Sequence, residues 1–89
     1  MSSAFLEVSF QNGKPFAAYL RLPRAAGTKV ARTREVRPGV VVDFSADGGA
    51  MGVEIIHPSQ TRPEVVLEVL AEVAASPVTL ADLAPLQAA

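Results

Sequence analysis

Four side chains in the middle of the sequence are of the types that form hydrolytic or metal sites. They are three carboxylates and the only histidine: Asp43, Asp47, Glu54 and His57. Carboxylates beside a histidine can act as general acid and base, or bind a metal ion. Such a metal site gathers three or more His or carboxylate ligands around an open position, and dispersed carboxylates with one histidine supply few. We therefore expect no catalytic residue, no cofactor and no bound metal.

The motifs of other common enzyme chemistries are also absent from the sequence. It contains no Gly-x-Gly-x-x-Gly run and no phosphate-loop lysine, so nucleotide binding of those types is unsupported. None of its six serines lies in a nucleophile-elbow motif, and the lack of cysteine excludes a thiolate nucleophile and any disulfide. We predict that the protein is not an enzyme, and a small hydrolase is the least favoured class.

A β-sheet explains the same acidic residues without a catalytic role. Apolar and polar residues alternate with a period of two through most of residues 4–56, which is typical of strands with one buried face. Three turn signals interrupt the alternation: Asn12-Gly13, Pro38-Gly39 and Asp47-Gly48. Asp47 then belongs to a turn, and Asp43 and Glu54 are expected on the solvated side of the sheet.

A helix is predicted after the strands. Thr61-x-x-Glu64 is a capping-box pattern, and the apolar residues that follow recur at helical spacings of three, four and seven. These signals predict a helix over residues 63–74, with an apolar stripe that can pack on the sheet.

The tail carries a second helix signal, which completes the predicted architecture. Thr79-x-x-Asp82 predicts a short helical segment over residues 79–84. The whole chain, residues 1–89, is then a single α+β domain. It consists of an approximately five-stranded, mostly antiparallel β-meander, one α-helix packed on the sheet, and the short helical tail.

Basic residues gather before the acidic turn and suggest an alternative function. Six of the eight Lys and Arg residues fall within residues 21–37, although the net charge is −1. Arg32 and Arg34 share one side of a predicted strand, and with Arg37 they are candidate contacts to nucleic acid. Cross-strand pairing of Arg32 and Arg34 with Asp43 or Glu54 explains the two arginines equally simply. Nucleic-acid binding therefore remains an alternative that we do not favour.

Apolar residues without evident cover predict self-association. One helix covers only one face of a five-stranded sheet, and the leucines of the tail also need cover. Six residues are the candidate oligomer contacts: Phe5, Val41, Ile56, Leu80, Leu83 and Leu86. Docking or exchange of the tail between two copies would bury several of them, so we expect a homo-oligomer and favour a dimer.

Neither a leader nor a membrane anchor is indicated by the residue pattern. The N-terminus lacks a basic start followed by a long apolar core, and no run approaches the length of a membrane span. We expect a cytoplasmic protein that does not enter a membrane.

The segment from about residue 17 to residue 56 resembles domain-of-unknown-function family 2283, a family of small, mostly bacterial proteins. The resemblance rests on four successive pieces of sequence: Val36–Gly39, Val40–Asp43, Asp47–Gly48 and Gly52–Ile55. The first hairpin and the tail after His57 depart from the family pattern. The resemblance implies a small sheet with a helix and brings no catalytic residues. Some members are similar to antitoxin-like partners of small toxins, which implies a protein-binding role. Our functional prediction is a non-enzymatic protein-binding module that acts as a homo-oligomer and holds another protein.

Overall fold

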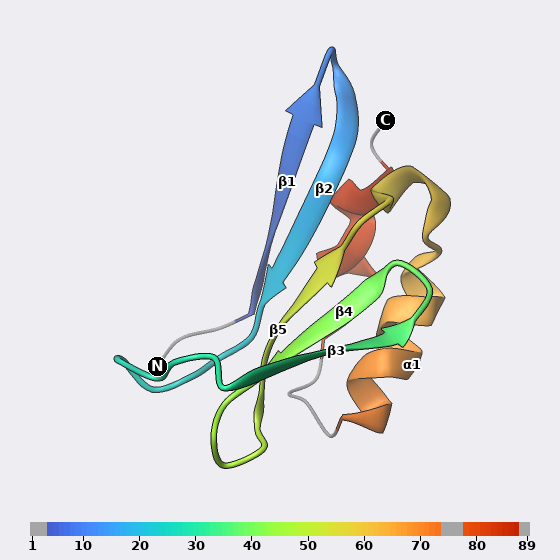
Figure 1. The fold of residues 1–89 in the computed structure, drawn as a ribbon. Helices are drawn as coiled ribbons and strands as arrows, with labels where there is room; N and C mark the ends of the chain where they lie inside the picture. The colour runs from blue at the N-terminus through green and yellow to red at the C-terminus, as the bar shows by residue number, and fades with distance from the viewer. Residues whose placement is uncertain (1–3, 74–77, 88–89) are drawn as a thin grey trace.

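The computed structural model describes residues 4–73 and 78–87, which form a five-stranded antiparallel sheet with helical segments behind it (Figure 1). The strands are β1 (Phe5–Gln11), β2 (Lys14–Arg21), β3 (Arg32–Arg37), β4 (Val40–Phe44) and β5 (Ala50–Ile55). One α-helix, α1 (Pro63–Glu72), follows the short 3-10 helix η1 (Pro58–Gln60), and a second 3-10 helix, η2 (Ala81–Gln87), forms the tail. The predicted α+β class with five antiparallel strands is confirmed.

The order of the strands in the sheet is β1-β2-β5-β4-β3, which differs from a meander at one point. Strand β5 lies between β2 and β4, where Val53 is opposite Leu20 on one side and Val42 on the other. The loop after β2 therefore carries the chain to the far edge of the sheet. Alternation predicts which face of a strand is buried but contains no information about its neighbours, so the sequence could not predict this order.

The turn between β1 and β2 forms as its residues predict. Asn12 and Gly13 have φ values of 54° and 77°, in the left-handed region that a two-residue hairpin turn with the favourable twist requires. Asparagine and glycine adopt this region at lower cost than other residues. The hairpin therefore closes directly and fixes β1 beside β2.

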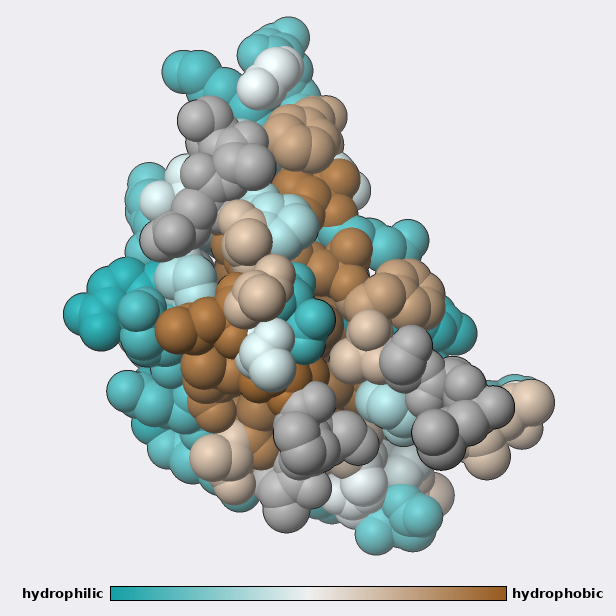
Figure 2. Space-filling model, turned by 180° about the vertical axis from the view of Figure 1, so that it is seen from behind, coloured by the Kyte–Doolittle hydropathy of each residue, from teal (hydrophilic) through white to brown (hydrophobic). Residues whose placement is uncertain are grey.

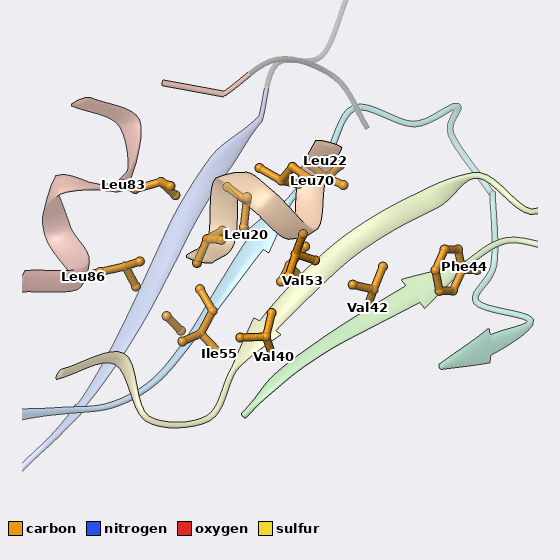
Figure 3. Packing of buried hydrophobic residues seen from close by; sticks show 13 residues of the cluster. Leu20, Leu22, Val40, Val42, Phe44, Val53, Ile55, Leu70, Leu83 and Leu86 are labelled. Carbon is orange, nitrogen blue, oxygen red and sulfur yellow. The ribbon is translucent and has the colours of Figure 1, made fainter. Parts of the chain in front are cut away.

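The hydrophobic core lies between one face of the sheet and the helical segments (Figure 3). The sheet contributes alternating residues that are almost fully buried, and α1 contributes the predicted stripe of Val66, Val69 and Leu70. Figure 2, seen from the helical side, shows apolar side chains gathered over the middle of this side, with polar residues around them. The burial of one face explains why the strands alternate.

Helix α1 begins without the capping box that the sequence predicts. Its N-cap residue is Arg62, and no side chain caps the helix. The hydroxyl of Thr61 instead donates a hydrogen bond to the carbonyl oxygen of His57 at 2.8 Å, because η1 occupies the residues before it. The helix ends at Glu72, close to the predicted end, and residue 74 lies outside the described residues. No helix in the described ranges is long and apolar enough to cross a membrane.

The second capping box forms as predicted. The backbone N–H of Thr79 donates to Asp82 Oδ2 at 2.9 Å, and the N–H of Asp82 donates to Thr79 Oγ1 at 3.3 Å. The segment continues to Gln87, beyond the predicted end at residue 84, with Pro85 inside it.

The tail leucines Leu83 and Leu86 are completely buried within their own chain. Segment η2 packs beside β1, and both side chains join the core cluster (Figure 3). Both predicted oligomer contacts therefore already have cover within a single chain, and the sequence did not show this because it does not report that the tail folds back onto the sheet. Leu80 is half exposed and remains a candidate contact.

Candidate functional site on the open face of the sheet

The face of the sheet opposite α1 and η2 is the candidate binding surface, and we call it the open face. The strand register places the side chains of Phe5, Tyr19, Glu54 and Val41 on this face, because their neighbours along each strand point into the core. The helical segments lie behind the sheet in Figure 1, so the open face is turned toward the viewer. No described helix covers it.

A line of polar side chains crosses the middle of the open face. The hydroxyl of Tyr19 on β2 donates a hydrogen bond to Asp43 Oδ2 on β4 at 3.1 Å. The hydroxyl of Thr33 on β3 donates to Asp43 Oδ1 at 2.8 Å. Tyr19 reaches Asp43 by lying across Gly52 of β5, where any Cβ atom would collide with the tyrosine ring. Asp43 therefore has two intramolecular partners, whereas the sequence predicted only a solvated position.

The environment of Tyr19 keeps its hydroxyl protonated. Burial raises the pKa of this tyrosine above its ordinary value of 10.0, the neighbouring Asp43 raises it further, and Arg24 opposes the change. A neutral phenol is a hydrogen-bond donor and a poor base at neutral pH. The Tyr19–Asp43–Thr33 line thus serves to hold four strands together and is poorly suited to proton abstraction.

The four side chains that could have formed a catalytic or metal site are not brought together. Asp47 accepts hydrogen bonds from the Ser45 hydroxyl and from the Gly49 N–H, at 3.0 Å for the latter. These bonds lower the pKa of Asp47 and commit its carboxylate to the turn, as predicted. Within residues 4–73 and 78–87, no three His, Asp or Glu side chains lie close enough together to hold a metal ion.

Apolar residues remain exposed at both ends of the open face. Phe5 is 50% exposed, with the Arg21 guanidinium 5.9 Å from the centre of its ring. Ile56 at the other end is 39% exposed, and Val41 between them is partly buried. These three predicted contact residues thus lie on one face of the molecule, as the alternation of the strands implied.

A shallow groove of about 520 Å³ lies at the Ile56 end of the open face. Its lining consists of Pro15, Phe16, Ala17, Glu54, Ile56 and His57. Alternation along β2 assigns Phe16 to the same side as the core residues Ala18 and Leu20, but the Phe16 side chain is 60% exposed. Strand β2 pairs with β5 only from Ala18 onward, so the β1–β2 hairpin projects beyond the rest of the sheet (Figure 1). The register of the β1–β2 ladder also shifts here and leaves Phe16 without a partner, and neither feature can be read from alternation in the sequence.

Two of the three candidate nucleic-acid contacts are unpaired among the described residues, and the third is held in an ion pair. Arg32 and Arg34 share one side of β3, as predicted, and lie over the ring of Phe44, with 5.2 and 5.5 Å from guanidinium to ring centre. Arg37 instead forms an ion pair with Glu72 of α1, in which Nη1 donates to Oε2 at 3.0 Å.

The alternative explanation of Arg32 and Arg34, cross-strand pairing with Asp43 or Glu54, is wrong. Arg32 is opposite Phe44 and Arg34 is opposite Val42, both of which are core residues. The arginines therefore emerge on the helical side of the sheet, whereas the two carboxylates lie on the open face.

Comparison with known families agrees with the resemblance seen in the sequence. Residues 17–59, just under half of the chain, match the family described as "Protein of unknown function (DUF2283)". The matched segment runs from β2 to η1 and contains the Tyr19–Asp43–Thr33 line, whereas β1 and α1 lie outside it. No curated protein and no solved structure matches the chain significantly.

Proposed function

We propose that the protein is a non-enzymatic, cytoplasmic protein-binding module that acts as a homodimer and holds a partner protein on the open face. The supporting observation is that this face carries Phe5 and Ile56, both substantially exposed, without cover from any described helix. At the Ile56 end, the exposed side chains of Phe16 and Ile56 line the same groove, and an apolar hollow of this kind is typical of surfaces that bind other molecules. An antitoxin-like role, in which the partner is a small toxin, is one form of this proposal.

The groove at Ile56 indicates the chemistry of the partner segment. Its floor and walls are mainly apolar, and Glu54 at its side is exposed and forms no ion pair among the described residues. Glu35 lines an adjoining hollow that also includes Ile56 and His57. A segment that presents an apolar side chain next to a Lys or Arg would fit this combination.

We propose that the protein has no enzymatic activity because its candidate polar groups already form structural hydrogen bonds. Asp43 accepts two hydrogen bonds, Asp47 closes a turn, and Tyr19 is held protonated. Each group thus has a structural role, and none of them is paired with a second group in the geometry of a nucleophile and its base.

The homodimer is tested by the mass of the full chain in solution. Light scattering after size-exclusion chromatography should give twice the chain mass of 9.3 kDa. A constant mass of one chain at micromolar concentrations would contradict the homodimer.

The partner-binding role is tested by capture with a tagged full-length chain in its native host. Ile56→Lys places a cation in the groove beside Glu54 and should abolish recovery of the specific partner. Val30→Lys is the matched control, because Val30 is a similarly exposed valine in the loop before β3. If the wild-type chain, Ile56→Lys and Val30→Lys all recover the same proteins, binding at the open face is contradicted.

Nucleic-acid binding is the second candidate function. Its support is the position of Arg32 and Arg34 on one side of an edge strand, with both guanidinium groups over Phe44. Arg37, the third predicted contact to nucleic acid, is already paired with Glu72 and is less available to bind a phosphate.

A further inference from the structure

The sheet has two outer strands, β1 and β3, each of which pairs on one side only among the described residues. They lie at opposite edges of the sheet (Figure 1). The outward backbone N–H and C=O groups of an edge strand can pair with a strand of another chain. The two edges differ strongly in their side chains, and this difference indicates which of them joins a second copy.

Geometry restricts how an edge strand pairs with its own copy. Antiparallel pairing about a twofold axis perpendicular to the sheet keeps both copies of each face on the same side. Two residues that lie opposite each other must then have side chains on the same face. Because side chains alternate between the faces along a regular strand, the two residue numbers are both even or both odd, and their sum is even. Only a few registers satisfy this condition for each edge.

Strand β3 is poorly suited to this pairing. With Arg34 on the axis, two guanidinium groups oppose each other directly, and with Thr33 on the axis, Arg32 opposes Arg34 of the second copy. Like charges directly opposite each other destabilise a strand pair. The arginines thus protect this edge from self-association, as charged residues commonly do on edge strands.

Strand β1 has the opposite character, because Glu7 is its only charged residue. With Val8 on the axis, Leu6 lies opposite Phe10 of the second copy, and Glu7 lies opposite Ser9 of the second copy. The first of these is an aliphatic–aromatic pair, and the second carries no like charges. Phe10, which is 55% exposed in the single chain, gains an apolar neighbour.

The nearest alternative registers of β1 are distinguishable from this one. With Glu7 on the axis, two carboxylates oppose each other, which is unfavourable. With Ser9 on the axis, the two Ser9 residues oppose each other and Glu7 faces Gln11, so charge substitutions at Ser9 have a different outcome.

We propose that a second copy of the chain pairs antiparallel with the outer edge of β1, with Val8 on the twofold axis. This inference rests on the proposed function, in that it names the surface by which the module self-associates. The two five-stranded sheets become one continuous sheet, and both open faces lie on the same side of it. The dimer therefore presents two copies of the groove at Ile56 on one broad surface.

Charge substitutions at the exposed Ser9 test the register. Ser9→Glu places one new carboxylate opposite each Glu7 of the second copy, which adds two like-charge pairs per dimer. It should therefore raise the dimer dissociation constant about two- to thirtyfold. Ser9→Lys should lower this constant by a similar factor. Adding Glu7→Lys to Ser9→Glu should restore the dimer, since each pair then has opposite charges. Sedimentation equilibrium of the full chain measures all four proteins.

Single cysteines give a second, independent measurement, because the chain contains no cysteine. Residues that share the axis have Cα atoms about 4.5–5.5 Å apart, within the range of a disulfide. Val8→Cys should therefore cross-link two chains under mild oxidation. Gln11→Cys, on the same strand but far from the axis, should not.

The possible outcomes separate this inference from the proposed function. A dimer whose dissociation is unaffected by the Ser9 substitutions, without a Val8→Cys cross-link, would overturn the β1 interface while leaving the homodimer intact. Weakening by both Ser9→Lys and Ser9→Glu, with a Ser9→Cys cross-link, would overturn the Val8 register. A monomer that still captures its partner through Ile56 would overturn the inference and leave partner binding standing.

Discussion

The phenol ring of Tyr19 lies across the backbone of Gly52, so that a side chain from β2 reaches Asp43 on β4 over the intervening strand. A glycine inside a strand weakens it because glycine has no side chain to pack. An aromatic ring from the neighbouring strand supplies that missing cover. The pair therefore packs the centre of the open face and places a hydrogen-bonded hydroxyl there.

Substitution of Gly52 by alanine tests this packing. The new Cβ atom collides with the tyrosine ring, so Tyr19 must move and lose its bond to Asp43. We expect a loss of about 1–3 kcal/mol in the free energy of unfolding, measured by denaturant titration. In a Tyr19→Ala background the same substitution should cost much less. Equal costs in both backgrounds would show that the ring does not restrict this position.

Loss of the Tyr19 hydroxyl alone should have a smaller effect. Tyr19→Phe keeps the ring over Gly52 and removes only the hydrogen bond to Asp43. The expected loss is about 0.5–1.5 kcal/mol, measured in the same titration. A cost as large as that of Gly52→Ala would mean that the hydrogen bond, and not the packing of the ring, dominates.

The tail leucines should differ sharply in their contributions to stability. Leu86 is fully buried in the core, so Leu86→Ala should lower the free energy of unfolding by about 2–5 kcal/mol. Leu80 is half exposed, and Leu80→Ala should change it by no more than about 0.5 kcal/mol. Thermal or denaturant unfolding checks both. Similar small effects at the two positions would contradict the docking of η2 on the sheet.

The ion pair between Arg37 and Glu72 should make stability depend on acid pH. The hydrogen bond from Arg37 lowers the pKa of Glu72 below its ordinary value of 4.5. The contribution of this ion pair to the free energy of unfolding is therefore fully present above pH 4.5, the ordinary pKa of a glutamate. It is lost as the pH falls through the lower pKa of Glu72 in the folded state.

Melting temperatures of wild type and Glu72→Gln at neutral and acid pH measure this contribution. Wild type should melt higher at neutral pH, and the difference should disappear in acid. The control is Glu54→Gln, because Glu54 forms no ion pair in the described part of the chain. A pH-independent difference for Glu72→Gln would exclude the ion pair as its cause.

Nucleic-acid binding should be weak, because the chain is slightly negative and one of the three arginines of β3, Arg37, is paired with Glu72. Fluorescence anisotropy with duplex DNA and with single-stranded RNA should show no submicromolar binding. Tight binding that falls steeply with salt and is lost in Arg32→Ala/Arg34→Ala would make nucleic-acid binding the leading function.

Local signals in the sequence predicted the elements well and their neighbours poorly. Alternation and turn residues located the strands, and Thr79-x-x-Asp82 predicted a cap that forms. Two similar signals had different outcomes. The Thr61 hydroxyl donates to the carbonyl oxygen of His57, whereas the Thr79 hydroxyl accepts from the backbone N–H of Asp82. A side-chain pattern within one segment does not report which distant segment lies beside it, and the place of β5 next to β2 is information of that kind.

The candidate site was predictable only where it depends on strand alternation. That rule placed Phe5, Val41 and Ile56 on the face opposite the helix. The role of Asp43 required the strand order, because Tyr19 and Asp43 come together only when β5 lies between their strands. A glycine in the middle of a strand was the one available signal, since it often marks close approach of another group.

Binding of a partner at the open face is the central claim, and it is tested most directly with the partner recovered from the native host. Isothermal titration calorimetry would compare its affinity for the wild-type chain, Ile56→Lys and the matched control Val30→Lys. We predict at least about a tenfold loss for Ile56→Lys, since a cation then fills the apolar groove and repels the basic partner group, and no loss for Val30→Lys. Equal affinities for all three chains would contradict the proposed function.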